Sequence, residues 1–423
     1  MKVYVRHLPF ALLVVLAVQS TRVIAANPDV VGSGSRTAWA QWRGPYGTGI
    51  SDAQNIPVQW DDSNVDWKTQ LEGRGYSSPI VWDDRIFLTS ALDKGHRCLV
   101  ICVDRKTGKA LWTQSTLNEE PERIHSMNSW ATPTCACDGQ VVVASFGNGG
   151  LHAYDLDGNK LWYRDLGQFD NVWGSASSPI ILNDMVIQTC DADNVAFLVA
   201  LNAHDGEEVW RTSRATNRSF STPVLMDTDH RQELVLNGHF GPAAYDPLSG
   251  KELWSCTGGS GRGTPTVVSA QGMAIVISGR SRGDGDMMAI RLGGEGDVTE
   301  THRVWNIERG GRDLPSPIVV EDYLVTVNIR PGLATCYEVA TGKELWKHRL
   351  QGKFSSSPIA VKGLVYVLTE SGETYVIEPG PRYREVARNR IMADETEVFR
   401  ASPVPYDGAI YCRSDTHLYR VTR

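Results

Sequence analysis

The chain has 423 residues, of which 41% are hydrophobic and 22% are charged, and its formal net charge is −7. This length supports a large buried core, and the composition excludes a disordered chain and a protein with many membrane spans. The 40 glycines and 20 prolines indicate many short strands joined by turns, and the 13 tryptophans invite a search for regular spacing.

The N-terminus has the pattern of a secretion signal. Lys2 and Arg6 precede an apolar run at residues 8–18, and residues 23–25 (Val-Ile-Ala) fit a cleavage site of small residues. The run is short for a membrane span, and no later segment is a candidate span. We therefore expect a signal peptide at residues 1–25, no transmembrane segment, and a periplasmic or secreted protein. Cleavage would remove three basic residues and no acidic one, so the net charge would go from −7 to −10, which argues against nucleic-acid binding.

A serine or threonine followed by proline recurs through the rest of the chain. It occurs eight times at intervals of 41 to 54 residues, and none of the other twelve prolines follows Ser or Thr. This interval is typical of a four-stranded propeller blade. Proline is tolerated at the start of a strand with an unpaired edge, so each one is expected to begin the innermost strand of a blade. The eight prolines are Pro79, Pro133, Pro179, Pro223, Pro265, Pro317, Pro358 and Pro403.

Between these prolines the sequence predicts three further strands, and the last of them follows a glycine turn and carries a tryptophan. The clearest copies are residues 104–112 (DRKTGKALW) and 338–346 (EVATGKELW). Glycine supplies the positive φ that a tight hairpin turn requires. The last repeat, residues 401–423, has room for only three strands, and residues 64–71, which contain Trp67, fit the missing fourth.

These features together predict an all-β fold, an eight-bladed β-propeller of four-stranded blades at residues 61–423. We expect the ring to be closed by pairing of the N-terminal strand with the C-terminal blade, because such closure leaves no open edge between the first and last blades. Residues 26–60 are then an N-terminal lead-in segment, and we expect a monomer.

The Asp-x-x-Thr-Gly-Lys-x-Leu-Trp unit, with its Ser-Ser-Pro-Ile starts, resembles the pyrroloquinoline-quinone (PQQ)-like propeller repeat over residues 64–423. Residues 39–45 (WAQWRGP) are similar to the lead-in of secreted bacterial members of that family. The resemblance implies that the tryptophan of each outer strand stacks between adjacent blades. These tryptophans are Trp67, Trp112, Trp162, Trp210, Trp254, Trp305 and Trp346.

The same resemblance implies two different functional types. One is the quinoprotein dehydrogenases, which use PQQ and calcium to oxidise alcohols or sugars; the other is non-catalytic and includes the propeller of the outer-membrane β-barrel assembly machinery. A dehydrogenase site of this kind would need a disulfide between adjacent cysteines, a catalytic Asp, and Glu and Asn ligands for calcium. The sequence has no Cys-Cys pair, no CxxCH motif and no metal-ligand spacing among its ten histidines.

We therefore assign no catalytic, cofactor-binding or metal residue and predict a secreted, non-catalytic platform without a cofactor. Its expected role is protein or ligand binding, or assembly, in the cell envelope. Two alternatives stay open. One is a PQQ- and calcium-dependent quinoprotein dehydrogenase of alcohols or sugars, and the other is a carbohydrate-binding propeller that uses Trp130 and Trp173 as its platform.

Two of the eight cysteines occupy a repeat position. Cys102 and Cys336 each stand ten residues before a repeat tryptophan, and the equivalent position in the third strand of four other repeats holds Ala153, Ala200, Ala244 or Ala289. A position that accepts Ala or Cys indicates a small buried group, so these thiols are expected to be structural. Disulfides among Cys190, Cys256 and Cys412 stay open.

A basic residue also recurs three to five positions before the proline in six of the eight repeats. Because these loops would lie on one face and surround the channel, the charges would form a positive ring in an acidic protein. We hypothesise that this mouth binds a carboxylate, an acidic glycan or an acidic peptide, so the expected partners are envelope or extracellular proteins or an acidic small ligand. The six residues are Arg74, Arg218, Arg262, Arg312, Lys353 and Arg400.

Overall fold

The structure is a computed structural model that describes residues 38–259, 262–279, 285–311 and 314–423, together with Met1. The signal peptide expected at residues 1–25 (apart from Met1), the lead-in up to residue 37, and Arg312 lie outside the described residues. Among the described residues, no helix is long and apolar enough to cross a membrane.

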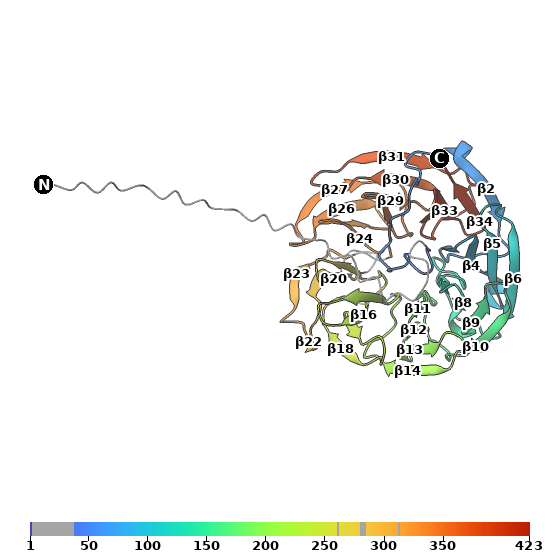
Figure 1. Cartoon of the computed structure of the whole chain (residues 1–423), viewed down its shortest axis with the longest axis horizontal. Helices are drawn as coiled ribbons and strands as arrows, with labels where there is room; N and C mark the ends of the chain where they lie inside the picture. The colour runs from blue at the N-terminus through green and yellow to red at the C-terminus, as the bar shows by residue number, and fades with distance from the viewer. Residues whose placement is uncertain (2–37, 260–261, 280–284, 312–313) are drawn as a thin grey trace. The chain divides into compact units, whose positions relative to one another are not determined.

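Eight antiparallel blades of four strands are arranged around a ring (Figure 1), so the predicted all-β, eight-bladed fold is confirmed. Two blades carry an additional fifth strand that pairs in parallel, β1 (Ile50–Ser51) on the seventh blade and β22 (Gly296–Asp297) on the fourth. Three short 3₁₀ turns, η1 (Asp62–Asn64), η2 (Asp93–Gly95) and η3 (Gly147–Gly149), are the helical elements of the described residues.

In each of the first four blades the strands follow chain order from the channel outward. Blade 1 consists of β3 (Ile80–Trp82), β4 (Arg85–Leu92), β5 (Arg97–Asp104) and β6 (Ala110–Leu117); blade 2 of β7 (Ala136–Cys137), β8 (Val141–Ser145), β9 (Leu151–Asp155) and β10 (Lys160–Arg164); blade 3 of β11 (Ile180–Leu182), β12 (Met185–Asp191), β13 (Ala196–Asn202) and β14 (Glu208–Ser213); blade 4 of β15 (Val224–Asp227), β16 (Gln232–Leu236), β17 (Ala243–Tyr245) and β18 (Glu252–Ser255).

The other four blades repeat this order, except that the outer strand of the last blade comes from the start of the chain. Blade 5 consists of β19 (Val268–Ala270), β20 (Met273–Ile277), β21 (Met287–Arg291) and β23 (Arg303–Ile307); blade 6 of β24 (Ile318–Val320), β25 (Tyr323–Val327), β26 (Leu333–Glu338) and β27 (Glu344–Arg349); blade 7 of β28 (Ile359–Val361), β29 (Leu364–Leu368), β30 (Glu373–Ile377) and β31 (Glu385–Arg390); blade 8 of β32 (Val404–Tyr406), β33 (Ala409–Arg413), β34 (His417–Val421) and β2 (Val65–Gln70).

The ring is closed as the sequence predicted, by β2 pairing antiparallel with β34, so that Val65 lies opposite Val421 and Gln70 opposite His417. Glu397, in the loop that enters blade 8, supports this closure. Its carboxylate accepts hydrogen bonds from Lys68 Nζ at 2.8 Å and from the Tyr419 hydroxyl at 2.7 Å. Burial would raise the pKa of Glu397, but the hydrogen bonds from Lys68, Ser414 and Tyr419 lower it to about 2.

Replacing Glu397 with glutamine should lower the free energy of unfolding by about 2 kcal/mol at neutral pH, because charge-assisted hydrogen bonds are lost. The folded-state pKa of Glu397 lies below its usual value of 4.5, so its contribution is present above that pH and is lost as the pH falls toward 2. Urea titrations of the wild type and of Glu397→Gln should therefore show a difference in the free energy of unfolding that narrows as the pH falls from about 6 to about 3. A difference in the free energy of unfolding that does not change with pH would contradict the role of the Glu397 carboxylate. The control is Glu395→Gln, because Glu395 is exposed.

The outer strand of every blade is bulged at one equivalent position, which holds the repeat tryptophan in seven blades and Ala387 in blade 7. The residue before the tryptophan is the extra one. Six of the seven tryptophans lie opposite a small, buried residue of the neighbouring strand, whereas Trp67 lies opposite Arg420. The predicted small-residue position is thereby confirmed. The opposing pairs are Trp112 with Cys102, Trp162 with Ala153, Trp210 with Ala200, Trp254 with Ala244, Trp305 with Ala289 and Trp346 with Cys336.

The repeat tryptophans lie against the glycine turn of the next blade. At five of these turns the glycine has a positive φ, and a Cβ added there would come within 2.4–2.8 Å of the indole ring. The ring–turn pairs are Trp67 with Gly108, Trp112 with Gly158, Trp162 with Gly206, Trp210 with Gly250, and Trp305 with Gly342. Trp346 reaches the next blade through a hydrogen bond to the Gly380 carbonyl at 3.0 Å, whereas Trp254 bonds Glu233 of its own blade.

All eight cysteines are buried and unpaired, including Cys190, Cys256 and Cys412. Burial raises the pKa of Cys102 to about 12, so its thiol stays protonated and unreactive at neutral pH.

Candidate functional site

The serine or threonine beside each repeat proline belongs to a belt of hydrogen bonds around the channel. The backbone N–H of seven of the eight belt residues donates to the hydroxyl of the belt residue in the next blade, at 2.9–3.0 Å. The eight belt residues are Ser78, Thr134, Ser178, Thr222, Thr266, Ser316, Ser357 and Ser402, and all are buried.

Two of the eight repeat prolines do not stand at the start of the innermost strand, where the sequence placed them. In six blades the proline directly precedes the innermost strand, as predicted, but Pro133 and Pro265 stand three residues before theirs. In those two blades the belt residue is the threonine after the proline, Thr134 or Thr266. The hydrogen bond to the neighbouring blade, and not the proline, is therefore what the repeats share.

The channel inside the belt is crossed by the chain's own lead-in, residues 39–51. The carbonyl of Trp39 accepts from Val81 of blade 1 at 2.9 Å, and that of Ala40 accepts from Cys137 of blade 2 at 2.8 Å. Ile50 and Ser51 form β1, which pairs with β28 of blade 7. Because these partners belong to innermost strands of separate blades, the lead-in closes the channel as a plug.

Arg43 holds the plug in place. Its guanidinium is buried and donates to the carbonyls of Thr48 at 2.7 Å, Pro317 at 2.8 Å and Pro358 at 3.4 Å, so it joins the lead-in to blades 6 and 7. Burial lowers the pKa of Arg43 to about 9, which leaves the side chain protonated at neutral pH.

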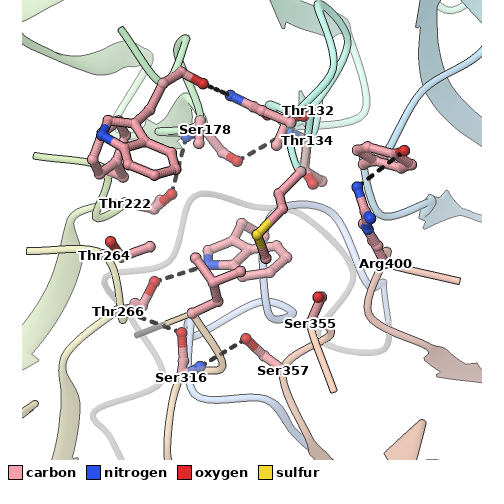
Figure 2. Close-up of a pocket in the computed structure, with 18 of the residues that line it drawn as sticks. Thr132, Thr134, Ser178, Thr222, Thr264, Thr266, Ser316, Ser355, Ser357 and Arg400 are labelled. Atoms are coloured by element: carbon pink, nitrogen blue, oxygen red, sulfur yellow. Dashed lines mark hydrogen bonds between the residues drawn. The ribbon is translucent and has the colours of Figure 1, made fainter. Parts of the chain in front are cut away.

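Above the plug lies a cavity of about 180 Å³, here called the cup, which opens where the innermost strands begin. Trp42 of the lead-in forms its floor and donates from its indole nitrogen to the Thr266 hydroxyl at 2.9 Å. Figure 2 shows the hydroxyl residues of successive blades around it. The cup is lined by Trp42, Tyr76, His125, Met127, Asn128, Thr132, Thr134, Trp173, Ala176, Ser178, Phe220, Thr222, Arg262, Thr264, Thr266, Leu314, Ser316, Ser355, Ser357 and Arg400.

One side of the rim is built around Trp173. The His125 ring lies against it, with ring centroids 4.2 Å apart, and the Arg262 guanidinium lies 3.9 Å from its ring centroid. The two loops that carry this side are joined below by Glu122, which accepts from the backbone N–H of Ser175 at 2.8 Å and from its hydroxyl at 2.9 Å. Burial raises the pKa of Glu122 to about 7.

Arg400 forms the opposite side of the rim. It lies over the Tyr76 ring and donates to the Tyr76 hydroxyl and to the Ser126 carbonyl, both at 3.2 Å. Its Nε also lies 3.3 Å from the Glu370 carboxylate, which partly neutralises it.

The structure brings two of the six predicted basic residues, Arg262 and Arg400, into the cup. Arg74 instead pairs with Asp415 at 2.9 Å, and Arg218 pairs with Asp193. Lys353 is exposed and does not line the cup, and Arg312 lies outside the described residues. The spacing of the basic residues identified the loops that precede the prolines. It did not reveal the acidic residues that pair with Arg74 and Arg218, because these residues belong to other loops.

The donor set of the cup does not fit a calcium-supported quinone. Calcium binds six to eight oxygen ligands and favours carboxylates, yet the described residues that line the cup include neither Asp nor Glu. In the described part of the chain no cluster of three His, Cys, Asp or Glu side chains is placed to hold a metal ion.

Neither tryptophan of the carbohydrate alternative forms an open platform. Trp130 packs over Gly95, where an added Cβ would lie 2.4 Å from its ring, and its indole donates to the Glu122 carbonyl at 2.8 Å. Trp173 carries His125 and Arg262 against its ring.

Comparisons with known proteins agree with this architecture. A family model described as outer membrane protein assembly factor BamB matches residues 50–187, 96–328 and 297–380. The outer membrane protein assembly factor BamB of Burkholderia pseudomallei (strain K96243) is 22% identical over 366 residues, which cover 80% of this chain and 84% of that protein.

Two solved structures share the fold. BamB from Moraxella catarrhalis has a TM-score of 0.60 at 15% identity, covering 85% of this chain and 99% of that chain. The quinohemoprotein alcohol dehydrogenase from Comamonas testosteroni has a TM-score of 0.67 at 12% identity, covering 92% of this chain and 81% of that chain. Both functional types have solved structures with this fold, so the likeness of fold does not distinguish them and the choice depends on the site.

Proposed function

Because this chain belongs to the family of outer membrane protein assembly factor BamB, we propose that it is a non-catalytic binding platform of the cell envelope that serves the assembly of outer membrane proteins. It would act in the periplasm, and its ligands would be proteins.

The observation that carries this proposal is the plugged channel. Arg43 fixes the lead-in across the channel, and the cup that remains above it is lined by hydroxyls, apolar groups, His125, Asn128 and two arginines, without a carboxylate among its described residues. Such a lining lacks the carboxylate ligands that the calcium ion of a quinoprotein dehydrogenase would need there. The surfaces that remain for binding partner proteins are the loops on the two faces of the propeller and the outer edges of its blades.

The cup itself suits an acidic group of a partner. Arg262 and Arg400 place two positive charges at its rim, and Arg43 adds a third, buried charge beneath the floor. Neighbouring arginines attract a carboxylate, and a poorly hydrated site strengthens that attraction.

Reversing the charge of Arg262 and Arg400 together to glutamate should weaken binding of an acidic peptide by about tenfold or more, since two attractive charges become repulsive. Fluorescence anisotropy with a labelled peptide rich in Asp and Glu measures this. Arg218→Glu is the control, because Arg218 pairs with Asp193 and does not line the cup. Equal affinities of the wild type, the double variant and Arg218→Glu for the acidic peptide would show that the cup does not bind it.

Deleting the gene in the source organism tests the function itself. The amount of folded outer membrane protein should fall and should return with the wild-type gene. An unchanged outer membrane profile, together with loss of a dye-linked oxidation of alcohols or sugars, would overturn the proposal.

A further inference from the structure

The outer edges of the blades differ in how they are protected. In the described sheets, seven blades end at their own outer strand, whose edge carries backbone N–H and C=O groups without a neighbouring strand, and blade 4 is covered by β22. Exposed edges of this kind pair readily with other strands, and proteins commonly guard them with charges.

Most outer strands carry such charges. In blades 3, 6 and 7 an acidic and a basic residue flank the bulge and form an ion pair across it. Blade 8 pairs Asp66 with Arg420, while the outer strands of blades 2 and 5 carry Lys160 and Arg303. The three flanking pairs are Glu208 with Arg211, Glu344 with Lys347, and Glu385 with Arg388.

The outer strand of blade 1 has no such guard. β6 reads ALWTQSTL and contains no charged residue, and Ala110 and Thr113 stand where blades 3, 6 and 7 have their ion pair. With eight residues it is also the longest outer strand. Near its two ends, Leu111 is 50% exposed and Leu117 is 77% exposed.

The unguarded edge is nevertheless held rigidly. The Trp112 indole donates to the Leu156 carbonyl at 2.9 Å, and the Gln114 amide donates to the Gly158 carbonyl at 2.8 Å, so the strand is fastened to blade 2. Beyond its bulge at Leu111 the strand is held in one conformation and is prepared to pair, because little conformational entropy is lost on binding.

Segments of the chain itself already pair with the edges of three blades. β22 extends blade 4 on its outer side, β1 extends blade 7 on its inner side, and β2 completes blade 8. Each of these additions uses backbone hydrogen bonds to a segment from a distant part of the chain. Pairing of a further segment with β6 would repeat this arrangement between molecules.

We propose that the outer edge of β6 binds an extended segment of a partner protein by β-strand addition, and that this segment is an uncharged strand in which apolar and hydroxyl residues alternate. An uncharged edge that ends in exposed leucines matches such a strand and offers nothing to a charged one. Eight residues span about 27 Å at about 3.4 Å per residue, which is most of the length of the tilted strand of about 9–11 residues that crosses the apolar band of a membrane β-barrel. The inference rests on the proposed function and names the part of an outer membrane protein that would be recognised.

The test uses the mature chain and a labelled peptide of about ten residues that alternates Val or Leu with Thr or Ser. Anisotropy should show saturable binding, and hydrogen exchange should slow at residues 110–117. The double variant Ala110→Glu/Thr113→Arg installs the ion pair of the other blades and should weaken binding by about tenfold or more. Glu208→Arg/Arg211→Glu on blade 3 keeps that edge charged and should bind as the wild type does.

Absence of peptide binding, or equal binding by the wild type and the β6 variant, would overturn the inference. So would protection that appears only outside residues 110–117, or protection of β6 that arises from a second copy of the chain, seen as a doubled mass in light scattering without peptide. These outcomes leave the assembly role untouched, because that role is decided by the gene deletion.

Discussion

Replacing Trp162 with alanine will lower the free energy of unfolding by about 3–5 kcal/mol, the usual cost of removing a large buried aromatic side chain. The indole is 6% exposed, lies against Gly206 of blade 3, and donates to the Ala203 carbonyl at 2.7 Å. The substitution therefore leaves both a cavity and an unsatisfied carbonyl between two blades. Urea unfolding followed by circular dichroism measures the loss.

The neighbouring residue provides the control. Leu161 is the extra residue of the bulge and is 43% exposed, so Leu161→Ala should change the stability by no more than about 0.5 kcal/mol. The adjacent residues Leu161 and Trp162 would then differ strongly in the stability lost on substitution by alanine, because the bulge turns only Trp162 toward the next blade. Equal effects of the two substitutions would contradict this docking role.

Replacing Arg43 with methionine will release the plug. Three carbonyls, those of Thr48, Pro317 and Pro358, lose their donor, and we expect a loss of about 3 kcal/mol because these hydrogen bonds involve a charged group. Limited proteolysis should then cut within residues 38–60 of the variant and should not cut there in the wild type, and the fluorescence of Trp42 should shift as water reaches the floor of the cup.

A lysine at the same position keeps the charge but not the planar fork that reaches several carbonyls, so Arg43→Lys should give an intermediate loss. Unchanged protease resistance in Arg43→Met would show that the lead-in is held by its other contacts, among them the pairing of β1 with β28.

The architecture was accessible from the sequence because its repeats are in phase. The glycine turn, the tryptophan and the small residue opposite it all follow from one hairpin geometry, and residues 64–71 supplied the strand missing from the last blade. Ring closure could thus be predicted without a long-range contact. The Ser or Thr beside each proline was visible as well, but not its hydrogen bond to the next blade, which spans 41 to 56 residues along the chain in six cases and 324 residues between blades 8 and 1.

The site was less accessible, because its parts meet only in the folded ring. The lead-in sequence has no periodicity, and Arg43 finds its acceptors 274 and 315 residues away. The basic residues before the prolines were recognised by spacing, yet their charge depends on partners in other loops, such as Asp415 for Arg74. Local patterns report which loops lie together and say little about which side chains neutralise one another.

The choice between the two functional types of this fold is tested most directly by titrating the mature chain with PQQ and calcium while an electron-accepting dye reports the oxidation of alcohols and sugars. A cup without a carboxylate among its described lining residues, above a channel closed by Arg43, predicts no saturable change in the PQQ absorbance and no dye reduction. Stoichiometric uptake of PQQ with sustained turnover would contradict the binding platform and identify an enzyme.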